Sequence, residues 1–148
     1  MTFLPPVAQP TEDIARIQFY FGLSIYVENV EGSIRKGDNW ATKAPAHYGY
    51  IIGYFGADGD EMDCYIGPHL TTGKVYIVDQ NKIDSEEFDE HKCMIGYHSQ
   101  QEALEDYFAG HNRGKSIFRG VTQMTPWQFQ SWLRFGNHRV PVSKQESI

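Results

Sequence analysis

The sequence predicts an α+β fold. Segments rich in Val, Ile and Tyr, which are typical of strands, lie before residue 98, and strong helix-capping signals follow them. The length of 148 residues suits one domain. No repeat, low-complexity tract or linker divides the chain, so we expect a single domain over residues 1–148.

The N-terminal segment is expected to form an irregular arm followed by a short helix. Residues 1–11 contain three prolines, and proline disfavours regular elements. Thr11 could cap the helix, because the two acidic residues after it would place negative charge in the first turn. Ile14, Ile17 and Phe21 would then form its apolar side.

The strands are predicted where apolar and aromatic residues run between turn signals such as Gly67–Pro68. They cover residues 23–28, 47–55, 63–66, 74–79 and 90–97. Two helices should follow. Ser99 and Glu102 have the spacing of a capping box, and Gly110 would end that helix. Thr125–Pro126 is typical of a helix start, with Gly136 as the stop.

The charge balance argues against several classes of protein. Thirteen Lys and Arg against nineteen Asp and Glu give a net charge of −6, which does not suit non-specific nucleic-acid binding. We see no apolar run long enough to span a membrane. The start of the chain lacks the basic and apolar regions of a secretory signal, and two cysteines cannot form a disulfide framework. We therefore expect a cytoplasmic protein.

The sequence Asp58-Gly59-Asp60-Glu61-Met62-Asp63 concentrates four carboxylates on what should be a tight turn. Carboxylate oxygens suit hard cations, so Mg²⁺ is expected here, with Mn²⁺ as an alternative. A solvated acidic turn is the other interpretation. An EF-hand loop does not fit, because Met62 and His69 fall where that loop needs a ligand and its closing glutamate.

Two further features have competing interpretations. His91, Cys93 and Cys64 could ligate zinc, although no Cys-x-x-Cys spacing supports this. The three tryptophans are predicted to fill or cover the core rather than to stack nucleobases; they are Trp40, Trp127 and Trp132.

The strand Tyr48-Gly49-Tyr50-Ile51 begins ten residues before the first aspartate of the acidic motif. In residue type and spacing, this segment resembles the soluble (family I) inorganic pyrophosphatases. The stretches 25–29 and 88–92 resemble shorter pyrophosphatase-like domains carried by phages. The resemblance implies a small five-stranded OB-like β-barrel flanked by C-terminal helices.

The resemblance also implies roles for individual residues. Asp58, Asp60 and Asp63 would hold metal, and Asp60 would also act as the general base on the attacking water. Tyr48 would line the phosphate site. The remaining substrate-binding positions correspond to Glu28 at the end of the early strand, to Lys36 or Arg35 beside it, and to Lys92.

A second acidic region completes the implied site. The family requires an acid two residues before a lysine, and Glu90 and Lys92 satisfy that spacing. Alternation along a strand would place both side chains on one face and turn Asp89 away. Glu90 would be a further metal ligand, and Asp79 is expected as the remaining one. Two departures stand out: Glu61 replaces a proline of the family motif, and His111–Asn112 aligns with its late Tyr-Lys pair.

The expected function is Mg²⁺-dependent hydrolysis of inorganic pyrophosphate to two orthophosphates, by in-line attack of a metal-activated water. One alternative is hydrolysis of nucleoside polyphosphates or other phosphoanhydrides on the same scaffold. Another is a catalytically inactive relative that binds a phosphate-rich ligand or a protein partner. The expected ligand is a small molecule, and a homo-oligomer remains open.

Overall fold

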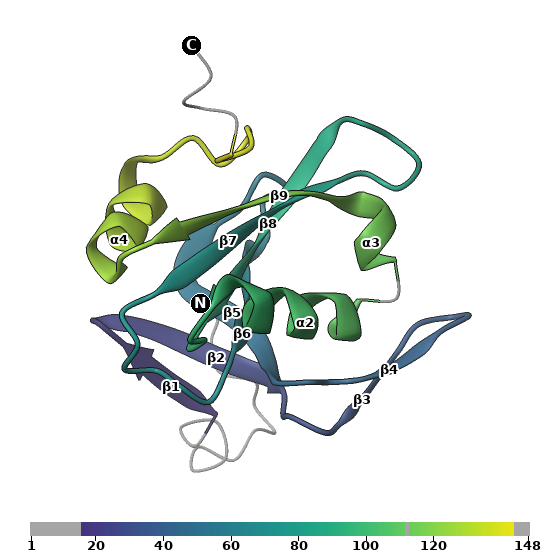
Figure 1. Ribbon diagram of the computed structural model, residues 1–148, viewed down its shortest axis with the longest axis horizontal. Helices are drawn as coiled ribbons and strands as arrows, with labels where there is room; N and C mark the ends of the chain where they lie inside the picture. Colours follow the sequence, from purple (N-terminus) through teal and green to yellow (C-terminus); the bar gives the residue numbers. More distant parts are fainter. Residues whose placement is uncertain (1–15, 112, 144–148) are drawn as a thin grey trace, which may run out of the picture.

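A mixed β-sheet forms the centre of the molecule (Figure 1). The computed structural model describes residues 16–111 and 113–143, and in this part the sheet has seven strands. In spatial order they are β1 (Ile17–Tyr20), β2 (Leu23–Asn29), β5 (His47–Phe55), β6 (Glu61–Ile66), β8 (Phe88–Ile95), β7 (Val75–Asn81) and β9 (Phe118–Met124). Strands β6 and β8 pair in parallel, and the other neighbours pair antiparallel. A separate ribbon contains β3 (Ile34–Lys36) and β4 (Ala41–Lys43).

The described helices are α2 (Gln100–Gly110), α3 (Gly114–Ile117) and α4 (Pro126–Phe135). Both predicted N-caps are confirmed, because the side chains of Ser99 and Thr125 accept hydrogen bonds from the first-turn backbone. The capping box is complete only in α4; in α2 the Glu102 carboxylate instead accepts from the backbone N–H of His98. None of the described helices has the length and apolar character needed to cross a bilayer.

The α+β class and the five predicted strands are confirmed, but the barrel is not. The described sheet contains two strands more than the five expected. Its edge strands are β1 and β9, and among the described residues these two strands do not pair to close a barrel. Strand β9 and the β3–β4 ribbon were not predicted. Both lie largely at the surface, where burial imposes little alternation on a sequence.

The helix predicted near the N-terminus is wrong at residues 17–20, which form β1 and pair with β2. Phe21 and Gly22 both have positive φ, at 46° and 83°, and connect the two strands in a tight hairpin. The predicted cap at Thr11 and the irregular arm over residues 1–11 lie outside the described residues.

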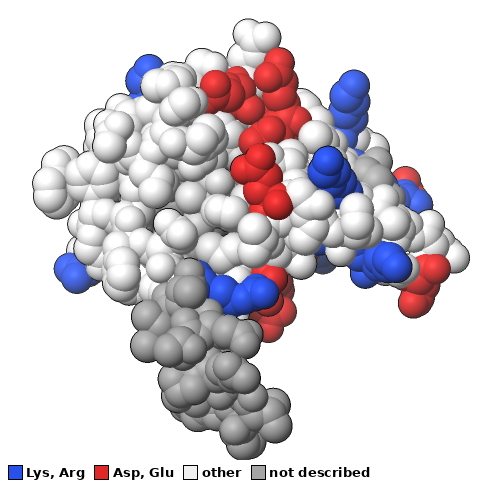
Figure 2. Space-filling view, turned by 90° about the horizontal axis from the view of Figure 1, so that it is seen from below, with Lys and Arg blue, Asp and Glu red and all other residues white. Residues whose placement is uncertain are grey.

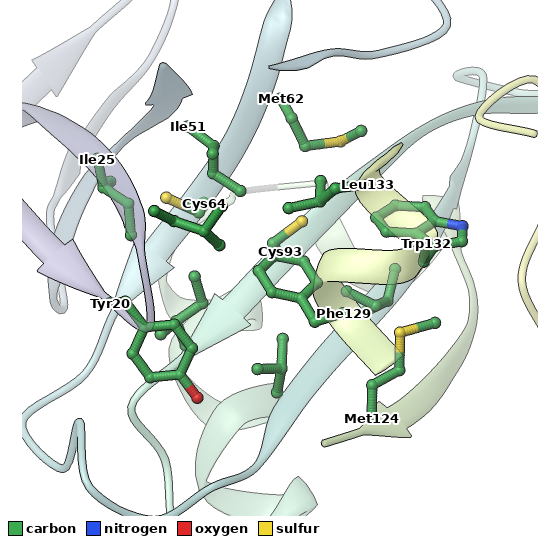
Figure 3. Close-up of a cluster of buried hydrophobic side chains, with 14 of the residues drawn as sticks. Tyr20, Ile25, Ile51, Met62, Cys64, Cys93, Met124, Phe129, Trp132 and Leu133 are labelled. Atoms are coloured by element: carbon green, nitrogen blue, oxygen red, sulfur yellow. The ribbon is translucent and has the colours of Figure 1, made fainter. Parts of the chain in front are cut away.

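The two faces of the sheet pack differently. One face, called here the α4 face, is covered by Phe129, Trp132 and Leu133 of α4, and both cysteines lie within it (Figure 3). The other, the α2 face, packs against Ala103 and Tyr107 of α2 and is rich in tyrosine. Because strand side chains alternate, polar residues of β5, β6, β7 and β8 can lie together on the α2 face.

Of the three tryptophans, only Trp132 is buried, as predicted. Trp40 is 40% exposed and Trp127 is 71% exposed, so neither of them fills the core. Trp40 follows the turn of the β3–β4 ribbon, which projects from the sheet and buries little surface of its own.

Candidate active site

Lys92 is the centre of a polar group on the α2 face. Its ammonium Nζ lies 2.6 Å from Asp63 Oδ2 and 3.4 Å from Glu90 Oε1, and it donates to the Tyr48 hydroxyl at 2.9 Å. Tyr48, Asp63 and Lys92 come from β5, β6 and β8, which are neighbours in the sheet. The structure therefore brings together four predicted site residues from three strands.

The surroundings of Lys92 keep it charged although it is buried. Burial alone would lower the pKa of Lys92, but Tyr48, Asp63 and Glu90 raise it well above the usual value. Burial raises the pKa of Tyr48, with Lys92 opposing that effect, so the phenol keeps its proton at neutral pH. The tyrosine accepts from the ammonium and retains an O–H that can be donated to a ligand.

Glu90 occupies an unusual environment for a carboxyl group. Burial and the charges of nearby acids, Asp63 above all, raise its pKa to about 7, while Lys92 opposes the rise. Asp58 contributes to the same increase, so the acidic turn lies within electrostatic reach of Glu90. The charge of Asp89 also raises the pKa of Glu90, although alternation along β8 places these two side chains on opposite faces of the sheet.

Gln80 is a site residue that the sequence did not reveal. It lies directly opposite Glu90 in the β7–β8 pairing, and its Nε2 donates to Glu90 Oε2 at 3.4 Å. The Tyr107 hydroxyl of α2 donates to Gln80 Oε1 at 2.7 Å, which fixes the orientation of the amide. A single glutamine in a strand does not indicate a site residue, because the contacts of Gln80 depend on the register between β7 and β8.

Asp79, the predicted remaining metal ligand, does not join this group. It lies on the α4 face, where its carboxylate accepts from the backbone N–H groups of Val142 at 2.9 Å and Ser143 at 3.0 Å, and from the Ser143 hydroxyl. His91 Nε2 lies 3.3 Å from Asp79 Oδ1. Burial alone would raise the pKa of Asp79, but the contacts with His91, Ser143 and Val142 lower it. The alternation of β7 explains the separation, because it turns residues 79 and 80 to opposite faces.

The acidic turn connects β5 to β6, and its geometry depends on Gly59, whose φ is +86°. The Asp58 carboxylate accepts from the backbone N–H of Asp60 at 2.9 Å, which fixes the turn from within. Both of these aspartates are exposed, whereas Asp63 is half-buried within β6. A hollow of about 300 Å³ beside Asp58 is also lined by Asp89 and Arg139. Figure 2 shows a band of acidic side chains with cationic ones nearby.

On the cationic side, the structure favours Arg35 over Lys36. The Arg35 guanidinium carbon lies 4.2 Å from the centre of the Tyr48 ring, and its Nη1 donates to the Gly110 carbonyl at 3.3 Å. Lys36 is exposed, and alternation places it on the other face of the ribbon. Glu28 lies within electrostatic reach of the group: partial burial and the charge of Asp63 raise its pKa, and Arg35 lowers it.

The donor set can be tested against the expected cation. Among the described residues, no three His, Cys, Asp or Glu side chains are grouped closely enough to hold a metal ion. The chemistry of the donors nevertheless fits Mg²⁺, because the predicted ligands are all carboxylates. Asp63 and Glu90 lie beside Lys92, and Asp58 and Asp60 lie on the exposed turn. In this structure the ammonium of Lys92 provides the positive charge beside Asp63.

Zinc fits less well. Cys64 and Cys93 are free, fully buried and located on the α4 face, where burial raises the pKa of both thiols. Zinc binds the thiolate form, which these surroundings disfavour.

Comparison with models of known protein families gives a match over most of the chain. The family model described as Inorganic Pyrophosphatase matches residues 14–134. No curated protein and no solved structure matches the chain.

Proposed function

Because the chain belongs to the inorganic pyrophosphatase family, we propose that it hydrolyses inorganic pyrophosphate to two orthophosphates with the help of Mg²⁺. The observation that carries the proposal is the buried, protonated Lys92 among Asp63, Glu90 and Tyr48. A lysine that stays charged inside a protein can bind a phosphate oxygen strongly, because little water screens the interaction. A net charge of −6 favours a small anionic substrate carried with a cation over a nucleic-acid partner.

The chain's own residues can divide the work of binding. Lys92 and Arg35 would pair with phosphate oxygens, and Tyr48 would donate its remaining proton to one of them. When the substrate binds, a phosphate oxygen would compete with the Asp63 carboxylate for Lys92. The pair would therefore loosen as the ligand enters.

The cation would be held by the carboxylates of the turn and of the neighbouring strands, namely Asp58, Asp60, Asp63 and Glu90. Bound Mg²⁺ supplies charge neutralisation on phosphate oxygens and makes a water more acidic. Asp60 is exposed on the turn, so its carboxylate is free to accept the proton of the attacking water. Water oxygen then bonds to one phosphorus while the bridging P–O bond breaks, which yields two orthophosphates.

Phosphate release from pyrophosphate, with Mg²⁺ and with a chelator, tests the proposal. We expect release only with Mg²⁺ and a loss of at least a hundredfold in Asp63→Asn, a value on the order of single electrostatic contacts in active sites. Asp84→Asn is the matched control, because Asp84 is an exposed loop residue whose φ of 56° asparagine tolerates. Equal rates in Asp63→Asn and the control would contradict the proposal.

A further inference from the structure

A hollow adjoins the proposed active site at the β3–β4 ribbon. It has a volume of about 390 Å³, within the range of small-molecule sites. The ribbon provides Arg35 and Trp40, the end of α2 provides Gly110, and the β7–β8 loop provides Ile83. The ribbon and α3 lie on the same side of the molecule in Figure 1.

Arg35 connects this hollow to the catalytic group. Its guanidinium carbon lies 4.2 Å from the centre of the Tyr48 ring and 5.9 Å from that of the Trp40 ring. Tyr48 in turn contacts Lys92 at 2.9 Å. A ligand whose phosphates reach Lys92 would therefore have its next groups beside Arg35 and Trp40.

The walls of the hollow include apolar surface that pyrophosphate does not need. Trp40 is 40% exposed and Ile83 is 55% exposed. Pyrophosphate consists of charged oxygens and phosphorus only, so it gains nothing from an indole or an aliphatic side chain. An organic group attached to a diphosphate would bury this surface.

The Trp40 indole is held in place by the ribbon turn. The backbone N–H of Gly37 donates to the Trp40 carbonyl at 2.9 Å. A Cβ added at Gly37 would lie 2.0 Å from Trp40 Nε1, so the ring packs directly on the glycine backbone. An exposed aromatic ring with a fixed orientation is a ready surface for stacking a planar group.

The hollow also has polar lining residues, His111 and Arg113, that suit the sugar and phosphate groups of a nucleotide. His111 Nδ1 accepts from the backbone N–H of Arg113 at 3.2 Å, so a neutral imidazole carries its proton on Nε2. Burial, together with the charges of Lys92 and Arg35, lowers the pKa of His111 and favours that neutral form. His111 and Arg113 both line the hollow and can donate to hydroxyl or phosphate oxygens.

We propose that this hollow binds the nucleoside part of a nucleoside diphosphate, with its base on Trp40 and its phosphoanhydride at the Lys92 group. The inference rests on the proposed function for the chemistry of the anhydride. Water would bond to the terminal phosphorus, the bridging P–O bond would break, and its oxygen would leave with the nucleoside monophosphate. Orthophosphate is the other product, and Asp60 would accept the proton of the water.

Calorimetry with two non-hydrolysable probes, in the presence of Mg²⁺, tests the inference. One probe is α,β-methylene-ADP, and the other is methylenediphosphonate, which has no nucleoside. We expect the nucleotide probe to bind about tenfold more tightly, the size typical of base stacking. Trp40→Ala should remove most of this difference, and Trp40→Phe should retain it. Trp127→Ala is the matched control, because Trp127 is another exposed tryptophan, located on α4.

Equal affinities for the two probes in the natural protein would overturn the inference, and so would a difference that persists in Trp40→Ala. Phosphate release from pyrophosphate is measured on the same preparation. Its absence, with the nucleotide preference intact, would refute the pyrophosphatase proposal alone. Its presence, with equal probe affinities, would refute the nucleoside subsite alone.

Discussion

Lys92 is the residue on which the proposed chemistry most depends. Changing it to Met keeps the length of the side chain but removes the charge that faces Asp63 and Glu90. We expect Lys92→Met to lower pyrophosphate turnover at least a hundredfold, while Mg²⁺ binding to the free protein persists, because lysine cannot ligate a cation. Phosphate release and calorimetry with Mg²⁺ measure the two effects.

Lys74→Met is the control for that experiment. The Lys74 ammonium donates to the His98 carbonyl, and this hydrogen bond is exposed and does not involve the proposed site residues. Circular dichroism shows whether each variant is folded. A folded Lys92→Met protein with unchanged turnover would remove Lys92 from the site.

The raised pKa of Glu90 gives a prediction for stability in metal-free protein. With a pKa of about 7 against an ordinary 4.5, the folded state holds a proton that the unfolded state has released. The free energy of unfolding should therefore fall as the pH rises from about 4.5 to about 7. Glu90→Gln should remove this part of the pH dependence, so the variant gains stability relative to the natural protein at pH 8.

Denaturant unfolding at pH 5 and pH 8, with a chelator present, measures the change. Glu105→Gln makes the same substitution at an exposed position of α2 and serves as the control. Identical pH profiles for Glu90→Gln and the natural protein would contradict the assigned environment.

The residue pattern could predict part of the site and not the rest. The acidic turn and the Glu90–Lys92 pair depend on local spacing, which a sequence displays directly. The choice between Asp79 and Gln80 depends on how β7 is shifted against β8, and the pairing contains an irregularity at Gln80–Asn81. A shift of one residue exchanges the two faces, so no local pattern could decide which side chain meets Glu90.

At the scale of the elements, the close approach of β2 and β5 determines where Tyr48 lies. A Cβ at Gly49 would lie 1.8 Å from the Tyr26 carbonyl oxygen, which belongs to the backbone and cannot rotate away. We expect Gly49→Ala to cost about 3 kcal/mol or more in the free energy of unfolding. Because Gly49 adjoins Tyr48, pyrophosphate turnover should fall as well.

Gly56→Ala is the control, because the nearest heavy atom to its added Cβ is 3.7 Å away, an ordinary contact. Denaturant unfolding of both variants gives the comparison. Similar stabilities would show that β2 and β5 can separate without cost.

Elements with strong end signals or a buried face could be predicted closely. Strand β5 has the predicted bounds, and α4 begins and ends at the predicted signals. Strand β1 was mistaken for a helix, because Ile14, Ile17 and Phe21 have helical spacing while the deciding feature is the Phe21–Gly22 turn. Strand β9 is held by pairing with β7 and has only one buried residue, Met124, so its sequence shows little alternation.

At the scale of the whole molecule, the net charge of −6 and the crowded carboxylates should make stability depend on divalent cations. Binding to the folded state alone adds about 2.7 kcal/mol when the ligand is in hundredfold excess over Kd. We expect millimolar Mg²⁺ to raise Tm by several degrees over protein in chelator. Sodium chloride of matched ionic strength is the control, and Asp63→Asn should remove most of the rise. An equal rise with sodium chloride would indicate screening instead of binding.

The parallel pairing of β6 and β8 has a consequence for how activity is lost. It is a seam between two halves that are each continuous in sequence, β1–β6 and β7–β9, and its register has Cys64 opposite Cys93. The proposed catalytic residues span the same seam, with Tyr48 and Asp63 on one side and Lys92 on the other. Both thiols are fully buried where α4 packs over the seam, so a thiol reagent reaches them only when this part of the core opens. Under increasing denaturant, alkylation of the cysteines and loss of phosphate release should therefore follow the same curve, so the two thiols would report whether the proposed site is assembled.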